Sequence, residues 1–187
     1  MSERVLLVDD EPHILSALQR LLRKGLRDTA GVRYEVESFT DASQALACAR
    51  ERAFALAISD QRMPGMSGVE FLSELRQVQP DCGRIILSGY ADLSALVAAI
   101  NEAEIARFIS KPWVDFDLLS AVRQVLRIRE LTLENQRLAD QVRQQTGVLS
   151  AQEAELRRLE RLEPGITHVK WGSDGSFILE DPGEVER

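Results

Sequence analysis

The sequence is poor in cysteine and histidine, and this shortage excludes several kinds of site. Its two cysteines, Cys48 and Cys82, stand far apart and lack the CxxC spacing of a redox or metal motif. We therefore expect reduced, half-buried thiols in a cytoplasmic protein. The two histidines, His13 and His168, are too few and too isolated for a zinc site.

Long apolar runs and an excess of basic residues are also missing. No apolar run reaches the roughly 20 residues of a membrane-spanning helix, and no leader pattern is expected at the start of the chain. A net charge of −7 disfavours nonspecific binding to nucleic acid. With 187 residues, of which 44% are hydrophobic, the chain suits one domain of usual size plus an extension. We expect a cytoplasmic protein that binds neither nucleic acid nor a membrane.

The first two thirds of the chain alternates short apolar runs with amphipathic segments. Such alternation predicts an α/β fold with a parallel sheet covered on both faces. Right-handed crossovers would give a flavodoxin-like, doubly wound (βα)5 sheet with strand order 2-1-3-4-5. The expected strands are residues 4–9, 34–39, 54–58, 84–87 and 107–110, and the expected helices are 12–24, 42–49, 67–78, 92–101 and 115 onward.

Polar side chains follow the ends of four predicted strands: Asp9 and Asp10, then Asp60, Ser88 and Lys111. Because ligand sites of open parallel sheets lie beyond the carboxyl ends of the strands, these groups are expected at one rim. Clustered carboxylates without cysteine or histidine suit Mg²⁺, and a lysine suits a phosphoryl group. Any of these residues alone would more often cap a turn or helix. Together they predict a site at which an aspartate accepts a phosphoryl group.

With these landmarks in order, the stretch from about Arg4 to Leu126 resembles the receiver domain of two-component response regulators. The resemblance implies that a sensor histidine kinase phosphorylates Asp60, with Mg²⁺ as the cofactor. It also implies a conformational switch that follows phosphorylation. The site residues it implies are Asp9, Asp10, Asp60 and the Arg62 backbone carbonyl for Mg²⁺, and Ser88, Phe108 and Lys111 for the phosphoryl group and the switch.

No output domain is recognisable after Leu126, neither a helix-turn-helix nor an enzymatic core, so the downstream protein target is unknown. We expect a response regulator and not an enzyme. One alternative is an aspartate-based, Mg²⁺-dependent phosphohydrolase, but this would need a second acid two residues after Asp60, where Arg62 stands. Another is a constitutive coiled-coil scaffold with a receiver that no longer responds, against which the intact acid set argues.

Residues 127–162 are expected to form a coiled-coil dimerisation helix, because apolar residues recur alternately three and four apart. β-branched residues at a and leucine at d favour a parallel homodimer, and one buried asparagine at a fixes its register. The alternative is a lone amphipathic helix that folds back on its own receiver. Taking Ile128 as a, the a positions hold Ile128, Asn135, Val142, Leu149 and Leu156, and the d positions hold Leu131, Leu138, Gln145, Gln152 and Leu159.

The last segment, residues 163–187, begins with the helix-breaking pair Pro164 and Gly165. Residues 167–171 and 176–180 are strand-like and are joined by a glycine-rich turn, which predicts a short hairpin-like tail. A frayed end and the start of a further domain are the alternatives. The expected domains are therefore 1–126 (receiver), 127–162 (coiled coil) and 163–187 (tail).

Overall fold

The computed structural model describes residues 2–26, 32–89, 103–162, 170–171 and 177–178. They fall into two compact units, Met1–Glu134 and Asn135–Arg187, each of which is described by itself. Among the described residues, no helix has the length and apolar character needed to cross a membrane. The predicted helix at 92–101 lies outside the described residues.

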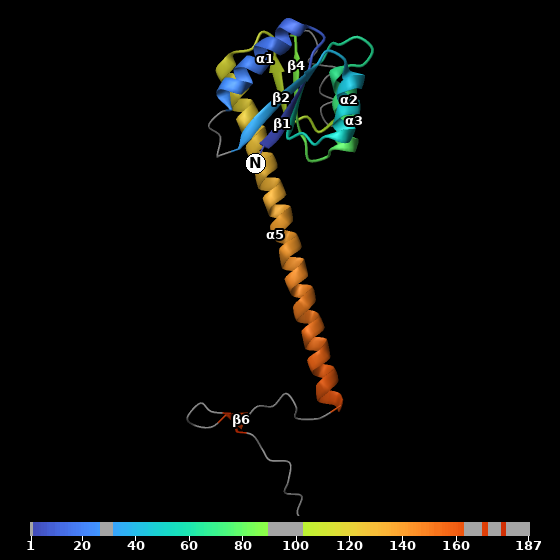
Figure 1. Cartoon of the computed structure of the whole chain (residues 1–187), viewed down its shortest axis with the longest axis vertical. Coiled ribbons are helices and arrows are strands. Elements are labelled where there is room, and N and C mark those ends of the chain that lie inside the picture. Colours follow the sequence, from blue (N-terminus) through green and yellow to red (C-terminus); the bar gives the residue numbers. More distant parts are fainter. Residues whose placement is uncertain (1, 27–31, 90–102, 163–169, 172–176, 179–187) are drawn as a thin grey trace, which may run out of the picture. The chain divides into compact units, whose positions relative to one another are not determined.

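The first unit is built on a five-stranded parallel sheet with the order β2-β1-β3-β4-β5 (Figure 1). This order confirms the predicted flavodoxin-like fold class. Placing β1 and β3 side by side brings the segments that follow them to the same edge of the sheet. The strands are β1 (Ser2–Val8), β2 (Arg33–Phe39), β3 (Leu56–Asp60), β4 (Gly83–Ser88) and β5 (Arg107–Ser110).

Helices cover both faces of this sheet, as Figure 1 shows. On one face α2 (Ala42–Glu51) and α3 (Gly68–Val78) enclose a core that includes Phe71 and Leu72. On the other face α1 (Pro12–Gly25) and the first turns of α5 (Asp115–Leu162) enclose a second core. Strand residues contribute alternately to the two cores, as a sheet buried on both faces requires.

The third strand ends later than predicted. The prediction placed it at residues 54–58, but β3 runs from Leu56 to Asp60, and Asp60 pairs with Leu87 of β4. The backbone N–H of Phe54 is instead bound by the Gln79 side chain at 2.8 Å. The acidic residue is therefore part of the sheet and does not lie on a loop. Pro64 and Gly65 are typical turn residues and indicate the loop that follows, but they do not indicate where the strand pairing ends.

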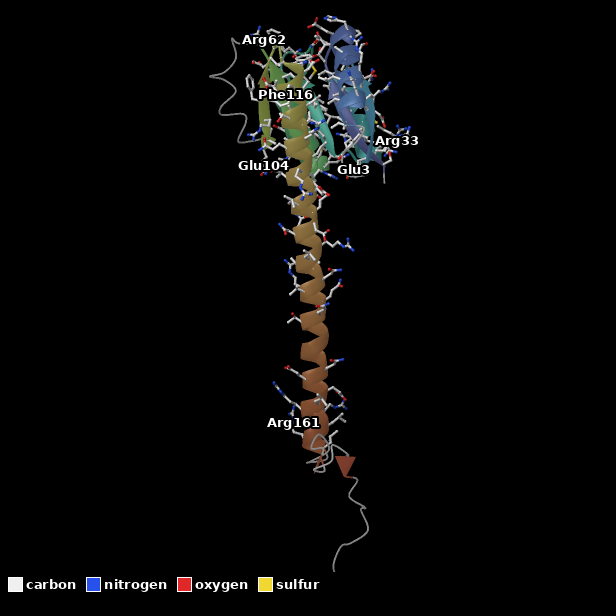
Figure 2. The ribbon with its side chains drawn as sticks, turned by 90° about the vertical axis from the view of Figure 1, so that its left-hand side faces the viewer. Glu3, Arg33, Arg62, Glu104, Phe116 and Arg161 are labelled. Atoms are coloured by element: carbon white, nitrogen blue, oxygen red, sulfur yellow. The ribbon has the colours of Figure 1, made fainter. Side chains whose placement is uncertain are left out.

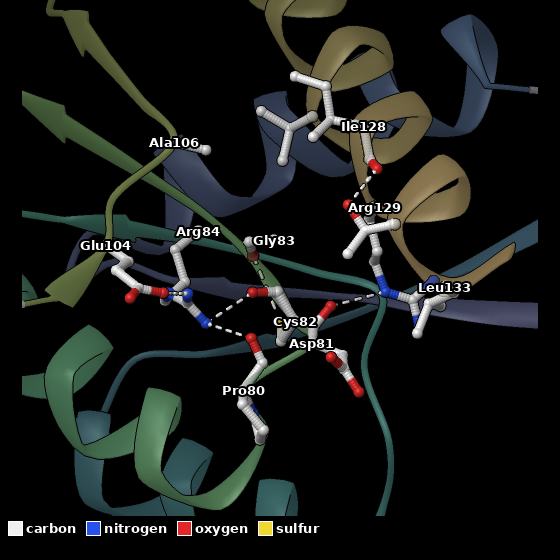
Figure 3. A pocket seen from close by; sticks show the side chains of 12 residues that line it. Pro80, Asp81, Cys82, Gly83, Arg84, Glu104, Ala106, Ile128, Arg129 and Leu133 are labelled. Carbon is white, nitrogen blue, oxygen red and sulfur yellow. Dashed lines mark hydrogen bonds and ion pairs between the residues drawn. The ribbon is translucent and has the colours of Figure 1, made fainter. Parts of the chain in front are cut away.

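The helix that follows the sheet is one element from Asp115 to Leu162, so the predicted domain boundary after residue 126 falls inside it. Arg129 of α5 donates to the Asp81 carbonyl oxygen at 2.9 Å (Figure 3). It also donates to Glu3 Oε1 at 2.9 Å. These contacts fix α5 to the amino-terminal ends of the strands. A pocket lies beside these Arg129 contacts. It is lined by Pro80 to Arg84, Glu104 and the α5 residues around Ile128.

Two smaller predictions have mixed outcomes. Cys48 is half-buried as expected, but Cys82 is fully buried, and this burial raises the pKa of its thiol to about 12. In the tail, β6 (Lys170–Trp171) and β7 (Phe177–Ile178) pair antiparallel, which confirms the pairing of the predicted hairpin. The residues that connect these strands lie outside the described ranges.

Candidate functional site

Three of the predicted side chains meet at the carboxyl ends of the strands. Asp9 follows β1, Asp60 ends β3 and Lys111 follows β5. The Lys111 Nζ donates to Asp9 Oδ2 at 2.8 Å and forms an ion pair with Asp60 Oδ1. Both aspartates are buried, with 0% and 6% of their surface exposed. The site is therefore a buried group of two carboxylates bridged by one ammonium.

Backbone hydrogen bonds hold these side chains in place. The Glu11 N–H donates to Asp9 Oδ1 at 2.9 Å, and the Arg62 N–H donates to Asp60 Oδ2 at 2.6 Å. The Lys111 N–H donates to the Ser88 carbonyl oxygen at 2.7 Å, which continues the β4–β5 pairing into the loop. Each carboxylate thus has one oxygen fixed by a backbone N–H and the other directed to Lys111.

Burial and charge act in opposite directions on the ionisable groups. Burial raises the pKa of Asp9 above its usual value, although its hydrogen bonds with Lys111 and with the Glu11 N–H act to lower it. Burial alone would lower the pKa of Lys111, but its hydrogen bonds to Asp60 and Asp9 outweigh that effect and raise it. Lys111 is therefore held as a cation, and burial makes ionisation of Asp9 less favourable than in water.

Asp10 lies apart from this group. It is exposed and lines a pocket with residues of the β3–α3 loop, including Gln61 and Arg62. Gln61 Oε1 is buried there and has no hydrogen-bond partner in the described part of the chain. The described residues do not bring three or more His, Cys, Asp or Glu side chains together as a metal-binding group.

The oxygen donors nevertheless suit Mg²⁺, which proteins commonly bind through one or two carboxylates with several retained waters. Asp9 and Asp60 offer two carboxylates, and Gln61 Oε1 offers a buried acceptor for a hydrating water. The Arg62 carbonyl, predicted as a ligand, belongs to the residue whose N–H binds Asp60. The metal-ligand roles of these residues stay predictions.

The two predicted switch residues occupy different surroundings. Ser88 is buried at the end of β4, and its hydroxyl donates to the Gly89 carbonyl oxygen at 3.3 Å. Phe108 of β5 is partly buried against the core that α2 and α3 cover. Only Ser88 is tied to the lysine, through the backbone. The switch roles of both residues stay predictions.

One residue at the site was missed from the sequence. Gly68, the first residue of α3, approaches the backbone of Asp60 so closely that a β-carbon there would lie 2.0 Å from the Asp60 carbonyl oxygen. The only signal in the sequence is a glycine eight residues after the aspartate, in a segment that already contains Gly65. Turn chemistry explains Gly65 and offers no separate reason for Gly68.

Comparison with known proteins gives a consistent result. The family described as "Response regulator receiver domain" matches residues 5–123. The hydrogenase transcriptional regulatory protein HoxA of Cupriavidus necator is 39% identical over 145 residues, which cover 78% of this chain. The chain spans 28% of the length of that relative.

Solved structures also resemble the chain. The structure of an adenylate cyclase from Rhodopirellula baltica has a TM-score of 0.66 and 31% identity, covering 75% of this chain and 98% of that one. The signal receiver domain of an HD domain-containing protein from Pseudomonas fluorescens Pf-5 has a TM-score of 0.62 and 39% identity, with coverage of 71% and 92%. The second of these proteins is named as a receiver domain and the first as an enzyme. The two similarities therefore show a shared fold and not a shared activity.

Proposed function

The chain belongs to the response regulator receiver domain family, and on that basis we propose that it is a response regulator phosphorylated on Asp60. A sensor histidine kinase is the proposed donor. A carboxylate oxygen of Asp60 attacks the phosphorus of the kinase phosphohistidine, the P–N bond breaks, and the histidine nitrogen keeps the bonding electron pair. The contact of Lys111 with both Asp9 and Asp60 is the observation that carries this proposal.

The proposal gives each predicted residue a role. Mg²⁺, held by Asp9, Asp10, Asp60 and the Arg62 carbonyl, would neutralise charge on the phosphoryl oxygens. Lys111 supplies a cation held in contact with Asp60. The hydroxyl of Ser88 and the ring of Phe108 are proposed to move toward the acyl phosphate, which is how the site would alter the surface of the receiver.

We propose that the rest of α5 pairs with a second copy of the chain. The apolar seam residues with described side chains are all exposed, including Leu138 at 49% and Val142 at 60%. A lone helix would leave this surface in water, whereas a parallel coiled coil would bury it. The described apolar residues of the seam are Ile128, Leu131, Leu138, Val142, Leu156 and Leu159.

The phosphohydrolase alternative receives no support from the site. Its second acid would stand at position 62, where the chain has Arg62. The backbone N–H of Arg62 donates to Asp60, and a guanidinium cannot act as a general acid or base. We therefore propose a non-enzymatic, cytoplasmic regulator that acts on a protein target. A receiver that no longer responds would not need two buried carboxylates around one lysine. This arrangement therefore argues against the scaffold alternative.

The test is labelling with acetyl phosphate or a cognate kinase in the presence of Mg²⁺. Asp60→Asn should abolish labelling, because the amide is not a nucleophile, and a chelator should do the same to the wild type. Asp81→Asn, which changes an acid next to the pocket at the other end of β4, is the matched control and should be labelled normally. Strong labelling of Asp60→Asn would refute the assignment, and turnover of a small phosphoester would favour the phosphohydrolase.

A further inference from the structure

Two glycines of the β3–α3 loop meet different requirements. Gly65 has a φ of +82°, in the region that favours glycine, and no atom lies within 4 Å of a β-carbon built on it. Gly68 belongs to α3 and is not among the residues of positive φ. Its backbone conformation would therefore accept any L-residue. What Gly68 lacks is space.

The space at Gly68 is filled by the backbone of the proposed phosphorylation site. A β-carbon at Gly68 would lie 2.0 Å from the carbonyl oxygen of Asp60, 2.8 Å from its carbonyl carbon and 3.1 Å from Gln61 Cα. No side chain can rotate to relieve these contacts, because all three atoms are backbone. Either the Asp60–Gln61 peptide or the start of α3 would have to move.

The strand side of this contact has little freedom to move. Asp60 pairs with Leu87, and the Gln61 N–H donates to the Leu87 carbonyl oxygen at 2.8 Å. The Asp60 carbonyl oxygen also accepts from the Ser59 hydroxyl at 2.9 Å. Moving this peptide would disturb the end of β3 and, with it, the carboxylate that the same residue carries.

The helix side is equally restrained. Ser67 and Glu70 form a capping box at the start of α3, and hydrogen bonds from the Ser67 N–H and hydroxyl lower the pKa of Glu70. One turn later Phe71 is fully buried in the core between α3 and the sheet. The Gly68 N–H donates to the Gln61 carbonyl oxygen at 3.0 Å, which ties the two sides directly together.

We propose that Gly68 is a positioning residue, which places the Asp60 carboxylate by letting α3 begin in contact with the Asp60 backbone. The inference rests on the proposed function of Asp60. A methyl group at position 68 would push the peptide by about an ångström, and a displacement of that size at a reacting group is enough to reduce a rate by about 100-fold. The distance between Asp60 and Lys111 would change with it.

Gly83 provides a matched control. A β-carbon there would also be too close to another atom, 2.5 Å from Val125 Cγ1, but this atom belongs to a side chain of α5 and not to the backbone of Asp60. Gly83 begins β4 and lines the pocket beside Arg84 and Arg129 (Figure 3). That end of the unit, where Glu3 and Glu104 lie, is opposite the end that carries Arg62 (Figure 2).

The experiment compares Gly68→Ala with Gly83→Ala in the full chain, at a urea concentration and temperature where both are folded. We expect both to lower the urea midpoint. We expect only Gly68→Ala to lose labelling by acetyl phosphate, by about 10- to 100-fold, and to bind Mg²⁺ more weakly in calorimetry. If Gly68→Ala is largely unfolded, trimethylamine N-oxide is added to both variants to favour the compact state before labelling.

Equal labelling and equal Mg²⁺ affinity of the two variants, at equal folded fraction, would overturn the proposal. Gly68 would then be a packing residue only. Failure of the proposed function is a separate outcome, since it would show as a wild type that takes up no phosphoryl group. In that case the ratio of Mg²⁺ affinities between the two variants still decides the role of Gly68.

Discussion

Lys111→Ala removes a side chain that contacts both buried carboxylates of the site. In the folded protein, Asp9 and Asp60 would keep their backbone hydrogen bonds from Glu11 and Arg62 but lose their shared cation. Two like charges would then face each other in a buried setting. We expect a loss of stability at neutral pH that an exposed lysine would not cause.

The size of this loss follows from burial. Removing one partner of a buried ion pair destabilises proteins by about 3–5 kcal/mol, because the remaining charge is uncompensated. The Lys111 side chain keeps 22% exposure, so water screens part of the interaction. We therefore expect the free energy of unfolding to fall by about 2–3 kcal/mol, which is at or slightly below the lower end of that range.

The loss should depend on pH with a definite sign. Lys111 lowers the pKa of Asp9, so its removal raises that pKa further above the unfolded value. A raised pKa means that the folded state binds the proton more tightly, and this contribution is lost as pH rises through the folded pKa. The difference between wild type and variant should thus be small in acid and grow toward neutral pH.

Mg²⁺ should partly reverse the loss, since its charge replaces that of the lysine. A cation that binds only the folded state stabilises it by about 2.7 kcal/mol at 100 times its dissociation constant. The measurement is urea unfolding followed by the fluorescence of Trp113, in a Trp171→Phe background that leaves one of the two tryptophans. Lys24→Ala, an exposed lysine in the last turn of α1, is the control and should lose no more than about 1 kcal/mol.

A charge shared by the two buried carboxylates is ruled out if Lys111→Ala behaves like Lys24→Ala. A loss below about 1 kcal/mol, unchanged between acid and neutral pH and insensitive to Mg²⁺, would mean that Lys111 is a solvated loop residue. A large loss that is independent of both pH and Mg²⁺ would instead indicate lost packing of the lysine stem. Only the combination of size, pH dependence and rescue identifies a charge shared by the two carboxylates.

Two further predictions concern the metal site and α5. Asp9→Asn should raise the urea midpoint at neutral pH, because the raised pKa of Asp9 means that its ionised form destabilises the fold. The affinity for Mg²⁺ should fall by at least about tenfold in the same variant. An unchanged affinity would show that Asp9 is not a metal ligand. Truncation after Arg127 should convert a dimer to a monomer, so that light scattering gives the molar mass of one truncated chain. A dimer that persists would place the main interface on the receiver.

The rim of the sheet was predictable from the sequence because strand order alone brings its members together. Asp9 and Asp60 follow neighbouring strands, so the fold class already implied that they meet. Lys111 follows β5, which is separated from β3 by β4. Neighbouring strands are about 4.8 Å apart, so about two such spacings separate the backbone at Lys111 from the backbone at Asp60. The lysine and aspartate side chains can bridge this gap together, but the final position of the lysine between the two aspartates depends on the structure.

Other features depend on contacts that no local pattern records. The end of β3 is set by pairing of Asp60 with Leu87, which stands 27 residues later in the chain. Cys82 is fully buried in the core that α2 and α3 cover, and only the assembled fold puts it there. The requirement at Gly68 is likewise a distance between two segments. Residue type and period predict elements, whereas these features are fixed by how the elements approach one another.

The site and α5 are consecutive in the chain, and this restricts how one can influence the other. Only three residues separate Lys111 from Asp115, where α5 begins. From there Leu118 and Val122 are fully buried against the sheet, and Arg129 joins α5 to the far ends of the strands. Because packed cores change between discrete arrangements and do not deform smoothly, a displacement at Lys111 cannot be absorbed gradually along these turns. It must either stop at the loop or shift the buried turns of α5 together. Such a shift would have to break hydrogen bonds that tie α5 to the receiver, among them those of Arg123 with Gly25 and of Arg129 with Glu3.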